Sequence, residues 1–246
     1  MTPAGGAVID IAVARASRDR FSVKVMLSKA EKEYINTRGY WTLFKPLALF
    51  YRHQLELALT RALRREGVAL EGKRLLEDGC ERGNMLRQVI GLGAAPAACV
   101  GLDRDVEALR DARATTAPAV RFVCGDAAAL PFRPAAFDVV VQSLLFSSLE
   151  AGAARERAAA ELARVLAADG VLVWYDFVER AKEGLPRGLE LAEVRDLFPG
   201  WRLAPYKFGL RFRWVHFLVN KSFWLAQTLA ALGVARSHYV IVMRRP

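Results

Sequence analysis

Short apolar runs alternate with amphipathic segments between residues 73 and 177. Five runs are rich in valine, leucine and alanine and predict strands: Lys73–Asp78, Ala97–Asp103, Ala119–Cys124, Phe137–Gln142 and Val171–Phe177. Three intervening segments have the periodicity of helices: Met85–Leu92, Val106–Thr115 and Arg155–Ala167, the last closed by Asp169-Gly170. Continuous apolar strands need cover on both faces. The alternation therefore predicts an α/β fold with a mostly parallel sheet between two layers of helices.

The N-terminal part of the chain has a weaker pattern. Residues 1–27 show no stable periodicity, which predicts a disordered or loosely ordered start. Residues 28–72 predict a helical cap, first a short helix opened by a capping box of Ser28 and Glu31. A long helix then follows, which Thr42 caps and Gly67 ends.

The tail predicts two further strands with helices between them. The strands are Trp201–Phe208 and His238–Met243, and residues 214–233 predict one or two helices. No repeat or low-complexity linker divides the chain after residue 73. We therefore expect one domain over 73–246, with a helical insertion at 209–236 before the last strand.

Acidic residues follow three consecutive strands of the predicted sheet. Glu77 ends the first, Asp103 ends the second, and Asp126 follows the third. Because the carboxyl ends of parallel strands meet at one edge, a carboxylate at the second strand can accept hydrogen bonds from ribose hydroxyls. Each aspartate alone is as well explained as the cap of a loop or helix. All three in this order favour a shared site for a nucleotide-like ligand.

The sequence at these strand ends resembles class I S-adenosylmethionine-dependent methyltransferases. The resemblance rests on five blocks: Leu75–Asn84, Val100–Asp103, Gly125–Phe132, Phe137–Val140 and Ala163–Leu172. It implies a Rossmann-like sheet of seven strands with a final antiparallel strand, and S-adenosylmethionine as cofactor. A narrower resemblance to bacterial methyltransferases of polysaccharide or secondary-metabolite pathways rests on Tyr40-Trp41, Trp174–Phe177 and Ser237–Tyr239.

The resemblance also implies roles for matching residues. Glu77, Gly79 and Gly83 would line the methionine end of the cofactor, and Asp103 would bind the ribose. The adenine would contact Asp126 and Ala127, and Gln142 would lie near the sulfonium.

Glu81 departs from the family pattern, which has a glycine at this place. A side chain here must point away from the cofactor or reduce the space for it, and a second carboxylate beside the cofactor's own is unfavourable unless a cation such as Arg82 pairs with it. Three outcomes remain open. The loop tilts Glu81 to solvent, the affinity for the cofactor is reduced, or the protein binds the cofactor poorly and does not transfer methyl groups.

Methyl transfer requires alignment more than side-chain chemistry, but an oxygen acceptor can use a general base. The candidates are Asp176, Tyr175 and His53, each with a structural alternative: a loop cap, a core residue and a solvated helix residue. No cluster has metal-ligand spacing, and no Asn-Pro-Pro-Tyr-type sequence follows the fourth strand. We expect an O-methyltransferase acting on a small molecule or glycan. The alternative is a non-catalytic or weakly cofactor-binding scaffold subunit of the same fold.

The charge of the chain bears on its partners. The net charge is +10, and residues 197–246 contain eight Lys or Arg and no Asp or Glu. A basic, aromatic tail suits an anionic or glycan-bearing acceptor, or a membrane surface carrying a lipid-linked one. It is equally explained by aromatics in the core beneath arginines, and no nucleic-acid module is visible.

The compartment is predicted from the cysteines and from the absence of a targeting pattern. Cys80, Cys99 and Cys124 are predicted to be reduced core residues. Polar residues interrupt the apolar stretch from Trp214 to Val234, which argues against a transmembrane helix. We expect a cytoplasmic protein.

Overall fold

The computed structural model describes residues 46–178, 188–234 and 236–246. The unpatterned start at 1–27, the helix at 28–37, the Thr42 cap and Tyr40-Trp41 lie outside the described residues. The long helix of the cap is present as α2, Pro46–Arg65. Gly67 follows it with a φ of 63°, and the N–H of Val68 donates to the carbonyl oxygen of Leu63. This is the left-handed ending that the glycine predicted.

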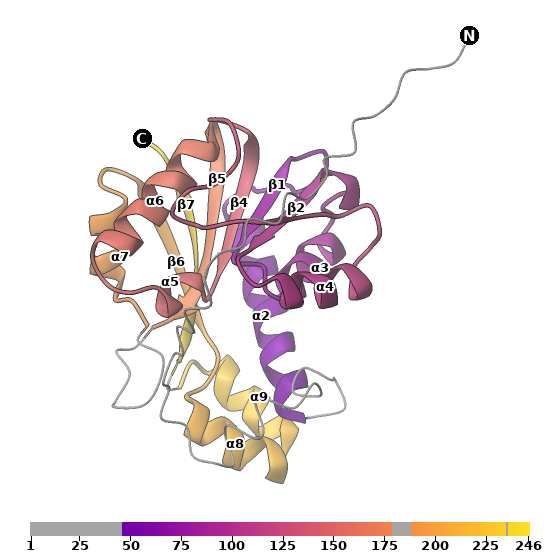
Figure 1. Ribbon diagram of the computed structural model, residues 1–246. Helices are drawn as coiled ribbons and strands as arrows, with labels where there is room; N and C mark the ends of the chain where they lie inside the picture. Colours follow the sequence, from indigo (N-terminus) through magenta and orange to yellow (C-terminus); the bar gives the residue numbers. More distant parts are fainter. Residues whose placement is uncertain (1–45, 179–187, 235) are drawn as a thin grey trace.

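Seven strands form one sheet (Figure 1). Their order in the sheet is β3-β2-β1-β4-β5-β7-β6, and β7 is antiparallel to both of its neighbours. The pairs among β1 to β5 are parallel. The predicted fold class, a mostly parallel Rossmann-like sheet with a final antiparallel strand, is therefore confirmed. The strands are β1 (Leu75–Asp78), β2 (Cys99–Asp103), β3 (Arg121–Cys124), β4 (Phe137–Ser143), β5 (Leu166–Phe177), β6 (Arg202–Phe208) and β7 (His238–Arg244).

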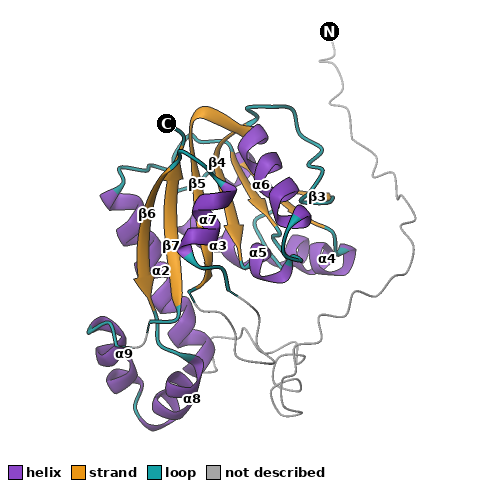
Figure 2. Ribbon diagram, turned by 90° about the vertical axis from the view of Figure 1, so that its left-hand side faces the viewer, coloured by secondary structure: helices purple, strands orange, loops and turns teal. Residues whose placement is uncertain are grey.

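Helices cover both faces of the sheet, as the apolar strands require (Figure 2). One core cluster packs α2, α3 (Asn84–Gly91) and α4 (Val106–Thr115) on the first face. A second cluster packs the other face against three helices: α5 (Leu145–Ser148), α6 (Ala153–Val165) and α7 (Leu191–Leu197). The C-terminal ends of β1, β2 and β3 lie at one edge between these layers, where the candidate residues were expected.

Several predicted boundaries are wrong. The first and third strands begin two residues later than predicted, at Leu75 and Arg121. The second strand begins at Cys99 because Pro96–Ala98 forms a 3-10 turn. Asp169-Gly170 does not close α6, which ends at Val165, but lies within β5. The register between β4 and β5 shifts between Phe137 and Val139, which absorbs the extra residues as a bulge. The sequence reasoning also missed α5 and α7, which are short.

Helices α8 (Phe212–Lys221) and α9 (Phe223–Ala231) lie between β6 and β7 and pack on α2 (Figure 1). We call these two helices, with the turn at 232–234, the helical lobe. Side chains of both helices join Leu47, Phe50 and Leu210 in a third apolar cluster. In the described part of the chain, no helix combines the length and hydrophobicity that a membrane crossing requires.

The far end of α2 is tied to the edge of the sheet by Glu66. Its carboxylate accepts a 2.7 Å hydrogen bond from the Tyr206 hydroxyl and lies 2.8 Å from Arg202. Arg244 donates to the backbone carbonyl oxygen of Glu66. The Tyr206 bond and the two arginines lower the pKa of Glu66 although the side chain is largely buried. One acidic residue thus holds α2, β6 and β7 together.

Candidate functional site

The β1–α3 turn is built on two glycines that no other residue replaces easily. Gly79 and Gly83 have φ angles of 75° and 71°, which disfavour side chains. A Cβ on Gly79 would lie 3.0 Å from Leu145 Cδ1, and one on Gly83 would lie 2.9 Å from Thr116 Oγ1. The N–H groups of Gly79 and Cys80 both donate to the carbonyl oxygen of Leu102, which joins the turn to β2.

Glu77 is enclosed beneath this turn. Its side chain is buried, and Oε2 accepts a 3.0 Å hydrogen bond from the backbone N–H of Leu86 in the first turn of α3. Burial raises the pKa of Glu77 well above its usual value, and the nearby Asp103 adds to this. The carboxylate therefore fixes the start of α3 against β1.

Asp103 joins the ends of β1 and β2. Its Oδ2 accepts from the Glu81 N–H at 2.8 Å, and its Oδ1 accepts from the Asp105 N–H at 2.9 Å. The side chain is half-buried at the edge of the sheet. Because each carboxylate oxygen can accept a second hydrogen bond, Asp103 keeps the capacity to bind a diol.

Glu81 adopts a φ of 45°, in the region where the family pattern has glycine. Its side chain is 58% exposed and pairs with Arg82 at 2.9 Å, and Arg82 also contacts Asp111. The left-handed conformation costs a non-glycine residue about 1–2 kcal/mol. The geometry favours the first of the three alternatives, in which Glu81 points to solvent and its charge is paired with Arg82. The left-handed backbone at Glu81 still lowers stability.

Asp126 and Ala127 form the turn after β3. Asp126 is exposed, and its Oδ1 accepts a 2.9 Å hydrogen bond from the Ala128 N–H. Ala127 is buried against the second core cluster. The structure thus brings these two residues to the same edge as Glu77, Gly79, Gly83 and Asp103.

Gln142 and Asp176 lie near the C-terminal ends of β4 and β5, on the face of the sheet that the second core cluster covers. Gln142 is fully buried, and its amide bonds the Tyr175 carbonyl and the Leu145 N–H. Asp176 is fully buried and accepts from the N–H groups of Ser147 and Phe177. Burial raises the pKa of Asp176 to about 6. In this geometry both side chains position α5 and the segment before it.

Asp78 is a residue that the sequence reasoning missed. It is fully buried in register with Leu102 and Gln142, and neither carboxylate oxygen has a hydrogen-bond partner among the described residues. Burial, with contributions from Asp103 and Asp126, raises the pKa of Asp78 to about 7. The available signal was its place after Glu77: two consecutive acids in a strand covered on both faces are both buried.

Aromatic side chains surround His238 at the other end of the same edge. Four ring centroids lie 4.7–5.7 Å from that of His238: those of Tyr51, Tyr175, Phe177 and Phe208. The centroids of Tyr175 and Phe208 lie 5.9 Å from each other. Burial lowers the pKa of His238 to about 3, so its imidazole is neutral at physiological pH. Tyr175, one of the predicted bases, is therefore a packed ring of this aromatic cluster.

His53, the third predicted base, lies elsewhere. It is exposed on α2, and its Nδ1 is 2.9 Å from the side-chain nitrogen of Gln227 in α9. Gln227 also bonds Gln54. The polar contacts of His53 thus connect α2 to the helical lobe.

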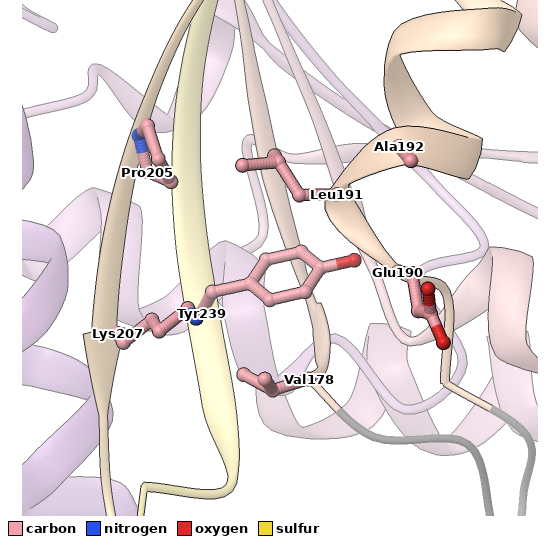
Figure 3. Close-up of a pocket in the computed structure, with 7 residues that line it drawn as sticks. All are labelled: Val178, Glu190, Leu191, Ala192, Pro205, Lys207 and Tyr239. Atoms are coloured by element: carbon pink, nitrogen blue, oxygen red, sulfur yellow. The ribbon is translucent and has the colours of Figure 1, made fainter.

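A pocket of about 300 Å³ lies beside the aromatic cluster, on the opposite face of β7 (Figure 3). Residues of α7, β6 and β7 line it with Val178, and Tyr239 crosses its floor. The Tyr239 hydroxyl donates to the Leu189 carbonyl oxygen at 2.7 Å. None of the predicted cofactor residues lines this pocket. Within the described ranges, no three His, Cys, Asp or Glu side chains are grouped as metal ligands would be.

Residues 76–174 match a sequence family described as a methyltransferase domain. None of the curated proteins compared with the chain matches it. The matched region contains β1 to most of β5, and with them the strand ends at which the candidate residues meet.

Solved structures show the same fold. A Pyrococcus horikoshii protein is 17% identical, with a TM-score of 0.59, over 87% of this chain and 99% of its own. A proposed methyltransferase of Haloferax volcanii, solved with the Trm112 methyltransferase activator, is 21% identical, with a TM-score of 0.55, over 77% and 88%. An S-adenosylmethionine-dependent methyltransferase of Mesorhizobium loti is 17% identical, with a TM-score of 0.54, over 76% and 98%.

The family match and the fold support a methyltransferase of the class I type, and S-adenosylmethionine is the cofactor that this domain implies. The residues present fit such a cofactor. A Cβ at Gly79 would crowd Leu145 at 3.0 Å, and Asp103 retains acceptor capacity at the end of β2.

Proposed function

We propose that the chain transfers a methyl group from S-adenosylmethionine to an oxygen of a small-molecule or glycan acceptor in the cytoplasm. The observation that carries the proposal is the placement of Asp103. Its carboxylate bonds the β1–α3 turn through the Glu81 N–H and stands at the same edge as Asp126. This is the arrangement that an adenosyl ligand extended across β1, β2 and β3 would need.

Each residue at this edge has a proposed part. Glu77, Gly79 and Gly83 shape the turn for the methionine end, Asp103 accepts from the ribose, and Asp126 with Ala127 contacts the adenine. The cofactor supplies an activated methyl group when bound. Gln142 acts on the sulfonium side through the Leu145 backbone that it holds.

The acceptor is proposed to approach over the aromatic cluster. The chain offers no exposed base there among its predicted candidates, because Asp176 is enclosed, Tyr175 is packed and His53 bonds Gln227. The proposal therefore assigns the rate enhancement to alignment of the acceptor oxygen with the methyl carbon and sulfur. The basic tail supports an anionic or glycan acceptor of the polysaccharide or secondary-metabolite kind. All three cysteines are free, in keeping with a reducing compartment. Cys80 and Cys99 are buried, but Cys124 is exposed, so the prediction that it is a core residue is wrong.

Calorimetric titration with S-adenosylmethionine tests the proposal. The wild-type chain should bind, and Asp103→Ala should weaken binding by about 1–3 kcal/mol because charged hydrogen bonds to the ribose are lost. Asp105→Asn, two residues away, is the matched control and should leave the affinity close to wild type. No binding at millimolar cofactor, or unchanged affinity of Asp103→Ala, would remove the assignment.

A second candidate is favoured by the backbone at Glu81. If the cost of its left-handed conformation and its carboxylate weaken cofactor binding, the chain works as a scaffold subunit with the fold of an enzyme. Transfer of a labelled methyl group to panels of phenols, sugars and lipid-linked sugars separates the two. Weak cofactor binding together with no transfer to any acceptor class would favour the scaffold.

A further inference from the structure

The helical lobe has an inner face that is packed and an outer face that is apolar without cover. On α8, Val215, Leu218 and Val219 face α2 and α9, at the spacing of one helix face. On α9, Ala226 and Ala230 do the same. The inner faces account for the folding of the lobe, but they leave its largest side chains outside.

Six of the nine large hydrophobic side chains that are exposed in the described residues belong to this lobe. Their exposed fractions run from 47% to 79%, and the six are Trp214, Phe217, Trp224, Leu225, Leu232 and Val234. Helix α9 contains no charged residue at all. An exposed apolar surface of this size on an uncharged helix marks an interaction site.

The charges around this surface restrict what covers it. Lys221 and Arg236 are exposed on or beside the lobe, and residues 197–246 contain no Asp or Glu. A second copy docked on the same patch would place these cations against their own equivalents. The chain's residues 1–45 would not neutralise them either, because they carry eight Lys or Arg against four Asp or Glu. An anionic lipid surface provides both apolar depth and negative charge.

We infer that the helical lobe docks on anionic membrane surfaces, with its aromatic and leucine side chains inserted at the level of the headgroups. Tryptophan and cationic side chains are the residue types enriched at that level. The lobe leaves the sheet after Phe208, the C-terminal end of β6, and returns at His238, which pairs with Phe177 at the end of β5 (Figure 2). Docking therefore turns the edge that carries the candidate site toward the lipid. The inference does not depend on methyl transfer.

Co-sedimentation with vesicles tests it on the full chain. Vesicles of phosphatidylcholine mixed with phosphatidylglycerol should retain the protein at least about tenfold better than phosphatidylcholine alone, and higher ionic strength should weaken this. The double variant Phe217→Ser, Trp224→Ser should lose about tenfold or more of the partitioning. Lys221→Glu should lose several-fold on anionic vesicles only. Val106→Ser, which removes a comparably exposed side chain on α4, should bind like wild type.

Two further measurements separate the occupants. Brominated acyl chains should quench the wild-type tryptophan fluorescence, and Trp224→Phe should keep the binding but lose part of the quenching. Cofactor titration and circular dichroism of each variant show that the fold and the cofactor site are unchanged. No preference for anionic vesicles, or unchanged partitioning of the double variant, would overturn the inference. So would a dimer in light scattering that the double variant converts to a monomer, which would assign the patch to a second copy.

Discussion

The two halves of the sheet edge are built by different means. On the side of β1 to β3, carboxylates meet backbone N–H groups in short loops: Asp103 bonds Glu81 and Asp105. On the side of β5 to β7, rings from distant parts of the chain surround His238. One half is acidic and comes from residues 77–127, and the other is aromatic and joins residues as distant in sequence as Tyr51 and His238.

The difference extends to how each half responds to protons. The half formed by β1 to β3 contains a carboxyl, Asp78, whose pKa is raised to about 7. The half formed by β5 to β7 contains an imidazole, His238, whose pKa is lowered to about 3. Burial keeps both groups neutral in the folded state. Asp78 therefore lowers folding stability as the pH rises, and His238 lowers it as the pH falls.

The largest expected effect is on Asp78. Below its unfolded pKa near 3.8 the group is protonated in both states, and between about pH 4 and 7 only the unfolded state ionises, which reduces folding stability. Asp78→Asn should therefore raise the free energy of unfolding by about 4 kcal/mol at pH 8 and leave it nearly unchanged at pH 4. Urea unfolding across this range measures it.

The exposed Glu107 on α4 supplies the control for that series. Glu107→Gln should change stability by less than about 0.5 kcal/mol at any of these pH values. A gain for Asp78→Asn that is absent at pH 8, or that is the same at pH 4, would contradict the buried-acid account.

The next effect has the opposite sign with pH. The unfolded state protonates His238 below about pH 6.5, whereas the folded state does so only near pH 3, so stability is lost as the pH falls through this window. His238→Phe has no group that titrates in this window. When the pH falls from 8 to 4.5, its free energy of unfolding should therefore rise by about 3 kcal/mol relative to that of wild type. Unfolding curves at both values give the difference. Phe208→Leu perturbs the same cluster without a titrating group, so its effect should not vary with pH; equal pH dependence in the two variants would refute the assignment.

The smallest effect concerns Glu81. Glycine accepts its φ of 45° without cost, so Glu81→Gly should stabilise the fold by about 1 kcal/mol. Cofactor titration shows whether the side chain also crowds the ligand: tighter binding supports crowding, and equal binding means that it already lies outside. Glu81→Ala keeps the backbone cost and removes the carboxylate, and it separates the two contributions. Loss of stability in Glu81→Gly would show that the Arg82 pair outweighs the backbone.

The sequence predicted the edge at β1 to β3 better than the edge at β5 to β7. Glu77, Gly79, Gly83 and Asp103 were placed at the edge because strand ends and turns depend on neighbouring residues. The sequence reasoning did not foresee that the side chains of Gln142 and Asp176 are enclosed, since the face of a strand is decided by its register with its neighbours. His238 had no local signal, because its cluster combines α2, β5, β6 and β7.

The position of β7 has a consequence for synthesis. This strand is the last of the seven along the chain, yet it lies between β5 and β6 and pairs with both. During translation the nascent chain can pair β1 to β5, but β6 has no partner in the sheet until residues 238–244 have left the ribosome. Until then β5 exposes an unpaired, strongly apolar edge, so this is the stage at which chaperones would be needed and at which a premature stop would do most damage.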